Sequence, residues 1–184
     1  MFGCGGQAKL SLDRTDIFLL IQNMQHYKTS LIDEEATQAL GKSLARCLQA
    51  GLTIYLHGDL GAGKTALTRA LLHGAGHQGK VKSPTYTLAE PYQITLIDKA
   101  CKVMHFDLYR MSSPEEFIEA GFRDEFNANT ICIIEWPEKA EGLLPQPDLD
   151  IYLSIPTDGR DVEIQAHSDA GQTCLSKLHF APRL

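Results

Sequence analysis

The chain has little positive charge, and this shortage argues against one class of protein. Its 184 residues include 17 Lys and Arg against 23 Asp and Glu, which gives a formal net charge of −6. Binding to nucleic acid depends mainly on Lys and Arg contacts to phosphates, so a chain that grips RNA or DNA by itself through a broad basic face is not expected. Any involvement of RNA should therefore run through protein partners.

Cysteine pairs and long apolar runs are also missing. The five cysteines are scattered and form no Cys-x-x-Cys pair, which supports neither a disulfide framework nor a zinc ribbon and fits a reducing cytoplasm best. No run approaches the ~18 apolar residues of a membrane span, and no cleavage site follows the apolar residues 17–21, so we expect neither a membrane segment nor a secretory signal. We expect residues 1–23 to be an extension, either disordered or upstream of a start at Met24, and residues 24–184 to form one domain.

The patterns that are present predict alternating helices and strands. Asp33 is a plausible N-cap for a helix that should end at Gly51. The apolar run 52–57 predicts a buried strand, and residues 64–74 predict a helix that stops at Gly74. Residues 85–110 predict two strands joined near residues 98–99.

The second half of the chain continues this alternation. Ser113 is a plausible N-cap, with Pro114 at the first helical position and Glu116 completing a capping box. An apolar strand over 130–136 and a hairpin with an Asp-Gly turn at 158–159 follow. The order of elements predicts an α/β fold: a three-layer, P-loop NTPase-like domain with a mixed, partly parallel central sheet and a C-terminal β-hairpin.

Residues 58–65, GDLGAGKT, form a complete Walker A pattern between a predicted strand and a predicted helix, which is the context that the motif requires. Glycines let successive backbone N–H groups point at phosphate oxygens, and the helix N-terminus adds positive potential. Lys64 should reach the β- and γ-phosphates, and the Thr65 hydroxyl should coordinate Mg²⁺. The stretch therefore predicts a bound polyphosphate.

A phosphate loop also needs an acid near the metal, usually at the end of an apolar strand. Asp107 closes the run 102–107 and Glu135 closes 130–135; both positions are suitable, because ligands of α/β sheets lie at the carboxyl ends of strands. The residues leave open which carboxylate is the main metal ligand, and either alone could be a capping or surface group. The hydroxyl-rich loop 83–88 could reach the γ-phosphate, or it could be an ordinary turn.

Together, the motifs GDLGAGKT, VKSPTYTLAEPY, HFDLYR and IIEWPEK, in this order and at these separations, resemble the TsaE (YjeE) family of P-loop ATPases. That family is required for threonylcarbamoyl-adenosine modification of bacterial tRNA. The resemblance covers residues 31–166 and implies a small ATPase that joins TsaD and TsaB, the subunits that carry the transfer chemistry. Slow, partner-stimulated hydrolysis of ATP would reset or regulate that complex, and tRNA would be met only through it.

The resemblance also implies roles for single residues. Thr65 and Glu135 would hold Mg²⁺, Asp107 would help to position water or metal, and Thr85 would act as a switch. Lys64 would join these as a catalytic group. The phosphate-loop residues implied to bind ATP or ADP are Gly58, Asp59, Gly61, Ala62, Gly63, Lys64, Thr65 and Ala66.

Further residues are implied to surround the nucleotide. Trp136 would lie beside the site, and the adenine would lie near Thr37 and Arg160. The chain departs from many relatives at Ala66, where they have a second threonine. Only the backbone N–H of Ala66 is therefore available for the α-phosphate.

Two other functions stay open at the level of sequence. A small-molecule or nucleotide kinase would share the phosphate loop but would also need an acceptor pocket and an arginine-bearing lid, whereas the arginines here are dispersed. A scaffold that senses nucleotide without useful turnover is excluded by no residue. A GTPase is disfavoured, because no Asn-Lys-x-Asp motif is present.

Overall fold

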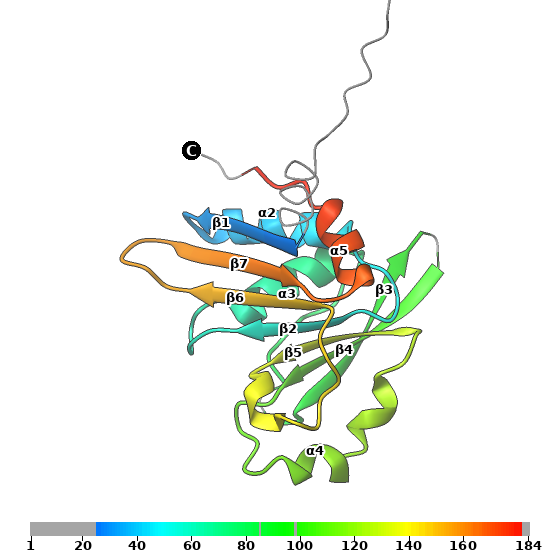
Figure 1. Ribbon diagram of the computed structural model, residues 1–184. Coiled ribbons are helices and arrows are strands. Elements are labelled where there is room, and N and C mark those ends of the chain that lie inside the picture. The colour runs from blue at the N-terminus through cyan, green and yellow to red at the C-terminus, as the bar shows by residue number, and fades with distance from the viewer. Residues whose placement is uncertain (1–24, 85, 98, 182–184) are drawn as a thin grey trace, which may run out of the picture.

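The computed structural model describes residues 25–84, 86–97 and 99–181, and these build one seven-stranded sheet (Figure 1). The strand order is β1-β7-β6-β2-β5-β4-β3. Neighbours in the group β6, β2, β5 and β4 pair in parallel, and the remaining pairs are antiparallel. The bounds are β1 (His26–Leu31), β2 (Thr53–His57), β3 (Ala89–Leu96), β4 (Lys99–Asp107), β5 (Thr130–Glu135), β6 (Leu149–Ser154) and β7 (Arg160–Ala166).

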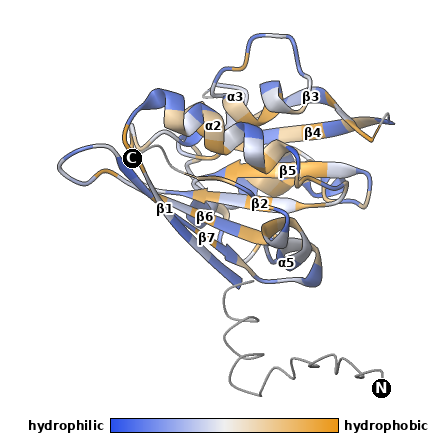
Figure 2. Ribbon diagram, turned by 90° about the horizontal axis from the view of Figure 1, so that it is seen from above, coloured by the Kyte–Doolittle hydropathy of each residue, from blue (hydrophilic) through white to orange (hydrophobic). Residues whose placement is uncertain are grey.

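Helices cover both faces of this sheet. On one face α2 (Glu34–Ala45), α3 (Lys64–Gly74) and α5 (Asp169–Ser176) share a core with the strands. On the other face α4 (Glu115–Glu119) and the 3-10 turns η1 (Phe122–Glu125) and η2 (Pro137–Ala140) lie over the central strands. Figure 2 shows hydrophobic residues concentrated on β2 and β5. The predicted three-layer α/β fold, its mixed sheet and its β6–β7 hairpin are confirmed.

The parallel strands give the sheet one edge at which several chain segments end. β6, β2, β5 and β4 all have their carboxyl ends there. β1 points the same way, because it is antiparallel to β7, which is antiparallel to β6. The loops that follow these strands therefore lie along a single edge.

Three elements were not predicted from the sequence: β1, η1 and α5. β1 pairs with β7 along its whole length and forms an outer strand of the sheet. It alternates exposed and half-buried residues, so its strand conformation depends on a partner that lies more than a hundred residues away. α5 follows the hairpin, and the Ser168 side chain caps it by accepting from the Gly171 N–H at 3.0 Å.

Two predicted helix boundaries were wrong. α2 begins after its Asp33 cap as expected, but it ends at Ala45, because the Arg46 N–H turns back to Ser43 and Leu44. Ser113 is not the residue before α4: Pro114 takes that place without a side-chain cap. Glu116 accepts instead from the Ser112 N–H at 3.2 Å.

The expected extension over residues 1–23 lies outside the described residues. Within the part of the chain that the structure describes, none of the helices has both the length and the apolar composition needed to cross a membrane.

Close packing of α2 on α3 gives a stability prediction. A Cβ on Gly41 of α2 would lie 2.9 Å from the carbonyl carbon of Ala70 on α3, so the two helices would have to separate. Gly41→Ala should therefore lower the free energy of unfolding by about 1–3 kcal/mol, although alanine is the better helix former by about 1 kcal/mol. Chemical denaturation measures this change.

The matched control is Gln38→Ala, at an exposed position of the same helix. It should change the free energy of unfolding by less than about 0.5 kcal/mol. A Gly41→Ala variant as stable as the parent chain would contradict the packing described here.

Candidate functional site

The phosphate loop connects β2 to α3, and all three of its glycines have a positive φ. Gly58 has φ 132° and Gly63 has φ 105°, values that residues with a side chain rarely adopt. A Cβ on Gly58 would collide with the Leu153 carbonyl oxygen, and one on Gly63 would lie 2.9 Å from Arg160 Nε. Gly58 and Gly63 thus meet the demands of both backbone conformation and close packing, whereas Gly61, at φ 84°, meets the conformational demand alone.

Lys64 is folded back onto its own loop and is almost fully buried. Its Nζ donates to the carbonyl oxygens of Gly58 and, at 2.9 Å, of Asp59. Burial lowers the pKa of Lys64 below its usual value, and the carboxylates of Glu135 and Asp107 oppose this shift. A bound anion could replace the two carbonyls as the partner of the ammonium, with a stronger charge-assisted bond.

The two predicted carboxylates lie side by side at the sheet edge. Asp107 ends β4 and Glu135 ends β5, and the two are paired in register. Glu135 accepts from the Thr65 hydroxyl, with distances of 2.9 and 3.2 Å to its two oxygens. Asp107 accepts from the Ser83 hydroxyl and from the Tyr109 N–H. Glu135 is thus attached to the phosphate-loop helix, and Asp107 to the segment before β3.

Trp136 follows β5 and covers the lysine. Its backbone has φ 60°, a left-handed conformation that costs a non-glycine residue about 1–3 kcal/mol and that accumulates at functional sites. The centre of its ring lies 3.9 Å from Lys64 Nζ and 4.9 Å from the centre of the Tyr109 ring. Trp136 therefore lies against Lys64 of the phosphate loop.

A cavity of about 460 Å³ lies over these groups, within the size range of small-ligand sites. Three cationic side chains line it, those of Lys64, Arg110 and Arg160. The predicted residues that it brings together are Gly61, Gly63, Lys64, Thr65, Ala66, Asp107, Glu135, Trp136 and Arg160.

The other predicted residues lie beside the cavity or outside the described chain. Gly58 and Asp59 contribute the carbonyls that hold Lys64, and Ala62 accepts from Arg160 Nε at 3.0 Å. Arg160 therefore lies at the phosphate loop itself.

Thr37 is separate from this cavity. It is buried, its hydroxyl donates to the Asp33 carbonyl at 3.2 Å, and it lines a small hollow of about 140 Å³ that shares Ala66 with the phosphate cavity. Thr85 lies outside the described residues, so its predicted switch role stays a prediction.

Reasoning from the sequence named the loop that contains Ser83, but it gave no role to His105 or Arg110. His105 Nε2 lies 2.9 Å from Glu135 Oε1, Ser83 contacts Asp107, and Arg110 lines the cavity. His105 precedes Asp107 by two residues, so strand alternation places both on one face of β4. The two-residue alternation of the strand could therefore have identified His105 from the sequence.

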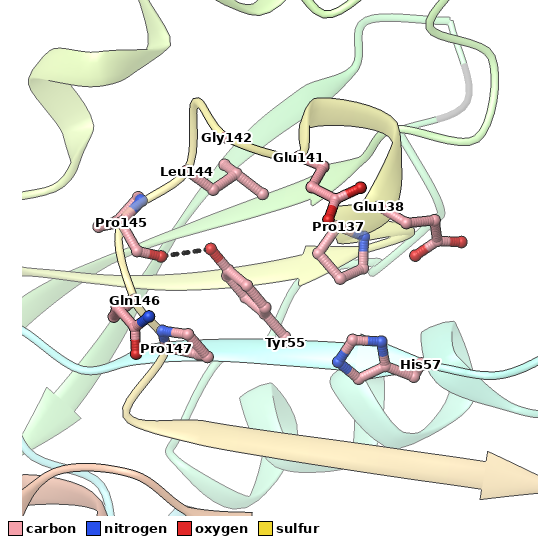
Figure 3. A pocket seen from close by; sticks show the side chains of 10 residues that line it. All are labelled: Tyr55, His57, Pro137, Glu138, Glu141, Gly142, Leu144, Pro145, Gln146 and Pro147. Carbon is pink, nitrogen blue, oxygen red and sulfur yellow. Dashed lines mark hydrogen bonds between the residues drawn. The ribbon is translucent and has the colours of Figure 1, made fainter.

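A second cavity, of about 410 Å³, lies between β2 and the chain that links η2 to β6 (Figure 3). The Tyr55 ring points into it from β2, and its hydroxyl donates to the Pro145 carbonyl oxygen. None of the predicted site residues lines this cavity.

Comparison with known proteins identifies the family of this chain. The family model for TsaE, "Threonylcarbamoyl adenosine biosynthesis protein TsaE", matches residues 31–162. The chain belongs to the TsaE family. The TsaE protein of Haemophilus influenzae is 45% identical over 149 residues, which cover 78% of this chain and 92% of that protein. The TsaE protein of Bacillus subtilis is 34% identical over 130 residues, covering 71% of this chain and 78% of its own.

A solved structure shares the TsaE fold found here. The crystal structure of Bacillus subtilis YdiB superposes with a TM-score of 0.66 at 27% sequence identity, over 84% of this chain and 94% of that one. The suspected resemblance to TsaE is therefore confirmed, and so is the fold that it implied.

The contact between Lys64 and Trp136 predicts a spectroscopic effect. Trp136 is the only tryptophan of the chain, and the ammonium lies on its ring. Lys64→Ala should therefore change the emission maximum or the intensity of intrinsic fluorescence without any nucleotide, since it removes a charge in contact with the indole.

Lys139→Ala is the control, because Lys139 is exposed and lies only three residues from the tryptophan. Its spectrum should match that of the parent chain, and circular dichroism should show that both variants are folded. Identical spectra for all three proteins would exclude the contact in solution.

Proposed function

We propose that this TsaE-family protein binds and hydrolyses ATP with Mg²⁺ in the cytoplasm. It would act as an accessory subunit of TsaD and TsaB in the modification of tRNA with threonylcarbamoyladenosine. Membership of the family supports the role in that biosynthesis. The observation that supports binding and hydrolysis of ATP with Mg²⁺ is the contact of the Thr65 hydroxyl with Glu135 inside the phosphate-loop cavity.

The donor set at this contact suits magnesium. Mg²⁺ prefers hard oxygen ligands, and it is usually held by one or two carboxylates together with substrate phosphates. Thr65 and Glu135 supply a hydroxyl and a carboxylate, and Asp107 lies opposite Glu135 in register. Among the described residues no group of three or more His, Cys, Asp or Glu side chains is arranged to hold a metal alone, which is consistent with a site completed by phosphates.

The charges around the cavity suit a triphosphate. Lys64 begins α3 directly after the loop, Arg160 on β7 donates to the Ala62 carbonyl of the loop, and Arg110 also lines the cavity. Cations placed around transferring phosphates stabilise the charge that develops on them. Asp107, held by Ser83 and by the backbone after β4, is in position to orient water or metal.

The edge that bears the site also exposes apolar side chains, which supports docking of protein partners. Large exposed apolar residues gathered on one surface mark interaction sites. The five at this edge are 42% to 87% exposed: Ile32, Leu60, Tyr86, Tyr109 and Ile155. We infer that TsaD and TsaB cover this edge, which would let them sense the nucleotide directly.

The metal assignment predicts unequal effects of the two carboxylates. Glu135 contacts Thr65, whereas Asp107 contacts Ser83. Glu135→Ala should therefore raise the Mg²⁺ concentration needed for half-maximal ATP hydrolysis by about tenfold or more, and Asp107→Ala should raise it less. A side-by-side Mg²⁺ titration measures both, and a larger effect of Asp107→Ala would reverse the assignment.

The partner assignment predicts a localised effect on stimulation. ATP hydrolysis should rise when TsaD and TsaB are added. Lys64→Ala should abolish ATP hydrolysis both with and without these partners. Ile155→Asp should weaken partner binding by about tenfold, because a charge would be buried at the contact. Hydrolysis by the isolated variant should stay unchanged, since Ile155 does not line the cavity.

Ile97→Asp is the matched control for this experiment. Ile97 is 97% exposed at the turn between β3 and β4, on the opposite edge of the sheet. Its variant should be stimulated like the parent chain. Equal losses from both substitutions would rule out the carboxyl edge as the docking surface.

A further inference from the structure

A fully buried histidine lies behind the carboxylate of Glu135. His105 is on β4, two residues before Asp107, and its side chain has no exposure to solvent. Its Nε2 lies 2.9 Å from Glu135 Oε1, and Glu135 itself is only 3% exposed. His105 does not line the cavity, so it would touch no nucleotide and can act only through its neighbours.

The surroundings of the ring decide which nitrogen donates. Nδ1 is buried and has no hydrogen-bond partner among the described residues. A hydrogen on Nδ1 would be an orphaned buried donor, and Nε2 would then turn a lone pair toward the carboxylate. The tautomer with hydrogen on Nε2 avoids both problems, so Nε2–H donates to Glu135.

This bond makes the two oxygens of Glu135 unequal. Among the residues that the structure describes, Oε1 accepts from His105 at 2.9 Å and from Thr65 at 2.9 Å, whereas Oε2 is contacted only by the Thr65 hydroxyl, at 3.2 Å. Oε1 therefore has two donors and Oε2 has the larger remaining capacity to bind a cation. The carboxylate is held in one orientation from the side away from the cavity.

Packing alone does not account for a histidine here. The neighbours on the same face, Val103 on β4 and Ile133 on β5, are aliphatic and fully buried. An unpartnered polar atom in the core is unfavourable. An aliphatic side chain would fill the position without leaving such an atom. The imidazole makes one polar contact with a described residue, and that contact is with the carboxylate of the site.

We propose that His105 is a positioning residue that orients Glu135 for Mg²⁺, by holding Oε1 with its Nε2–H so that Oε2 is presented at the phosphate loop. The inference rests on the proposed function, which supplies the metal. Outer partners of this kind commonly contribute about 10- to 100-fold to metal affinity.

The test compares His105→Leu with His105→Gln. Leucine removes the donor, whereas the glutamine amide can place an N–H near the position of Nε2. At saturating ADP, Trp136 fluorescence is followed as Mg²⁺ is added, and ADP binding is measured separately in EDTA. His105→Leu should raise the half-saturating Mg²⁺ concentration by about 10-fold or more, His105→Gln should recover most of that loss, and ADP binding in EDTA should be unchanged for both.

Two further variants separate positioning from general damage to the core. Val103→Ala weakens the same strand face without touching Glu135, so its Mg²⁺ dependence should match that of the parent chain. The double variant His105→Leu with Glu135→Ala should be no worse than Glu135→Ala alone, because a residue that acts only through Glu135 adds nothing once the carboxylate is gone. Additive losses, or a Val103→Ala effect as large as that of His105→Leu, would overturn the proposal.

A measurement on the parent chain remains decisive if His105→Leu does not fold. Nitrogen NMR of histidine-labelled protein should show the hydrogen of His105 on Nε2, and Glu135→Ala should shift that signal; a hydrogen on Nδ1 would overturn the proposal. The outcomes also distinguish failure of the His105 positioning role from failure of the proposed Mg²⁺ site. If Glu135→Ala leaves the Mg²⁺ dependence intact, the metal assignment fails. If Glu135→Ala weakens it and a folded His105→Leu does not, only the positioning role fails.

Discussion

Parallel pairing of β4, β5 and β2 is the constraint on which the site depends. It brings the carboxyl ends of three strands to one edge and sets Asp107 opposite Glu135 in register. The phosphate loop leaves β2 at the same edge, so the Thr65 hydroxyl at the start of α3 meets Glu135. A shift of β4 by one residue would turn Asp107 and His105 to the opposite face, because side chains alternate along a strand.

Polar groups are placed at this edge at a cost in stability. Lys64 is buried against carbonyls and an aromatic ring, Trp136 holds a left-handed backbone, and His105 keeps one unpartnered nitrogen. Each of these features, taken by itself, lowers the free energy of unfolding. The apolar residues on the two sides of the sheet offset these terms and keep the groups where they are.

The phosphate-loop cavity and an exposed surface share one edge of the sheet. The loops that line the cavity also carry exposed apolar side chains, among them Leu60 on the phosphate loop and Tyr109 after β4. Tyr86, 87% exposed, lies 5.0 Å from the guanidinium of Arg110, which lines the cavity. A partner docked there would contact the loops that surround the cavity. Occupancy of the cavity and shape of the docking surface would therefore be linked through a few shared residues.

Local chemistry along the chain was enough to predict the phosphate loop, the strand-end acids and most of the sheet. The glycines and Lys64 act through their own backbone and charge, and the apolar runs before Asp107 and Glu135 need no distant partner to be recognised. β1 and the positions of Arg160 and His105 depended on pairing between segments far apart in the chain. A hydrogen bond across strands is specified by register rather than by neighbouring residues. The sequence by itself therefore determined which chemical groups are available, and only the tertiary structure decided that Glu135 contacts Thr65 and that Asp107 contacts Ser83.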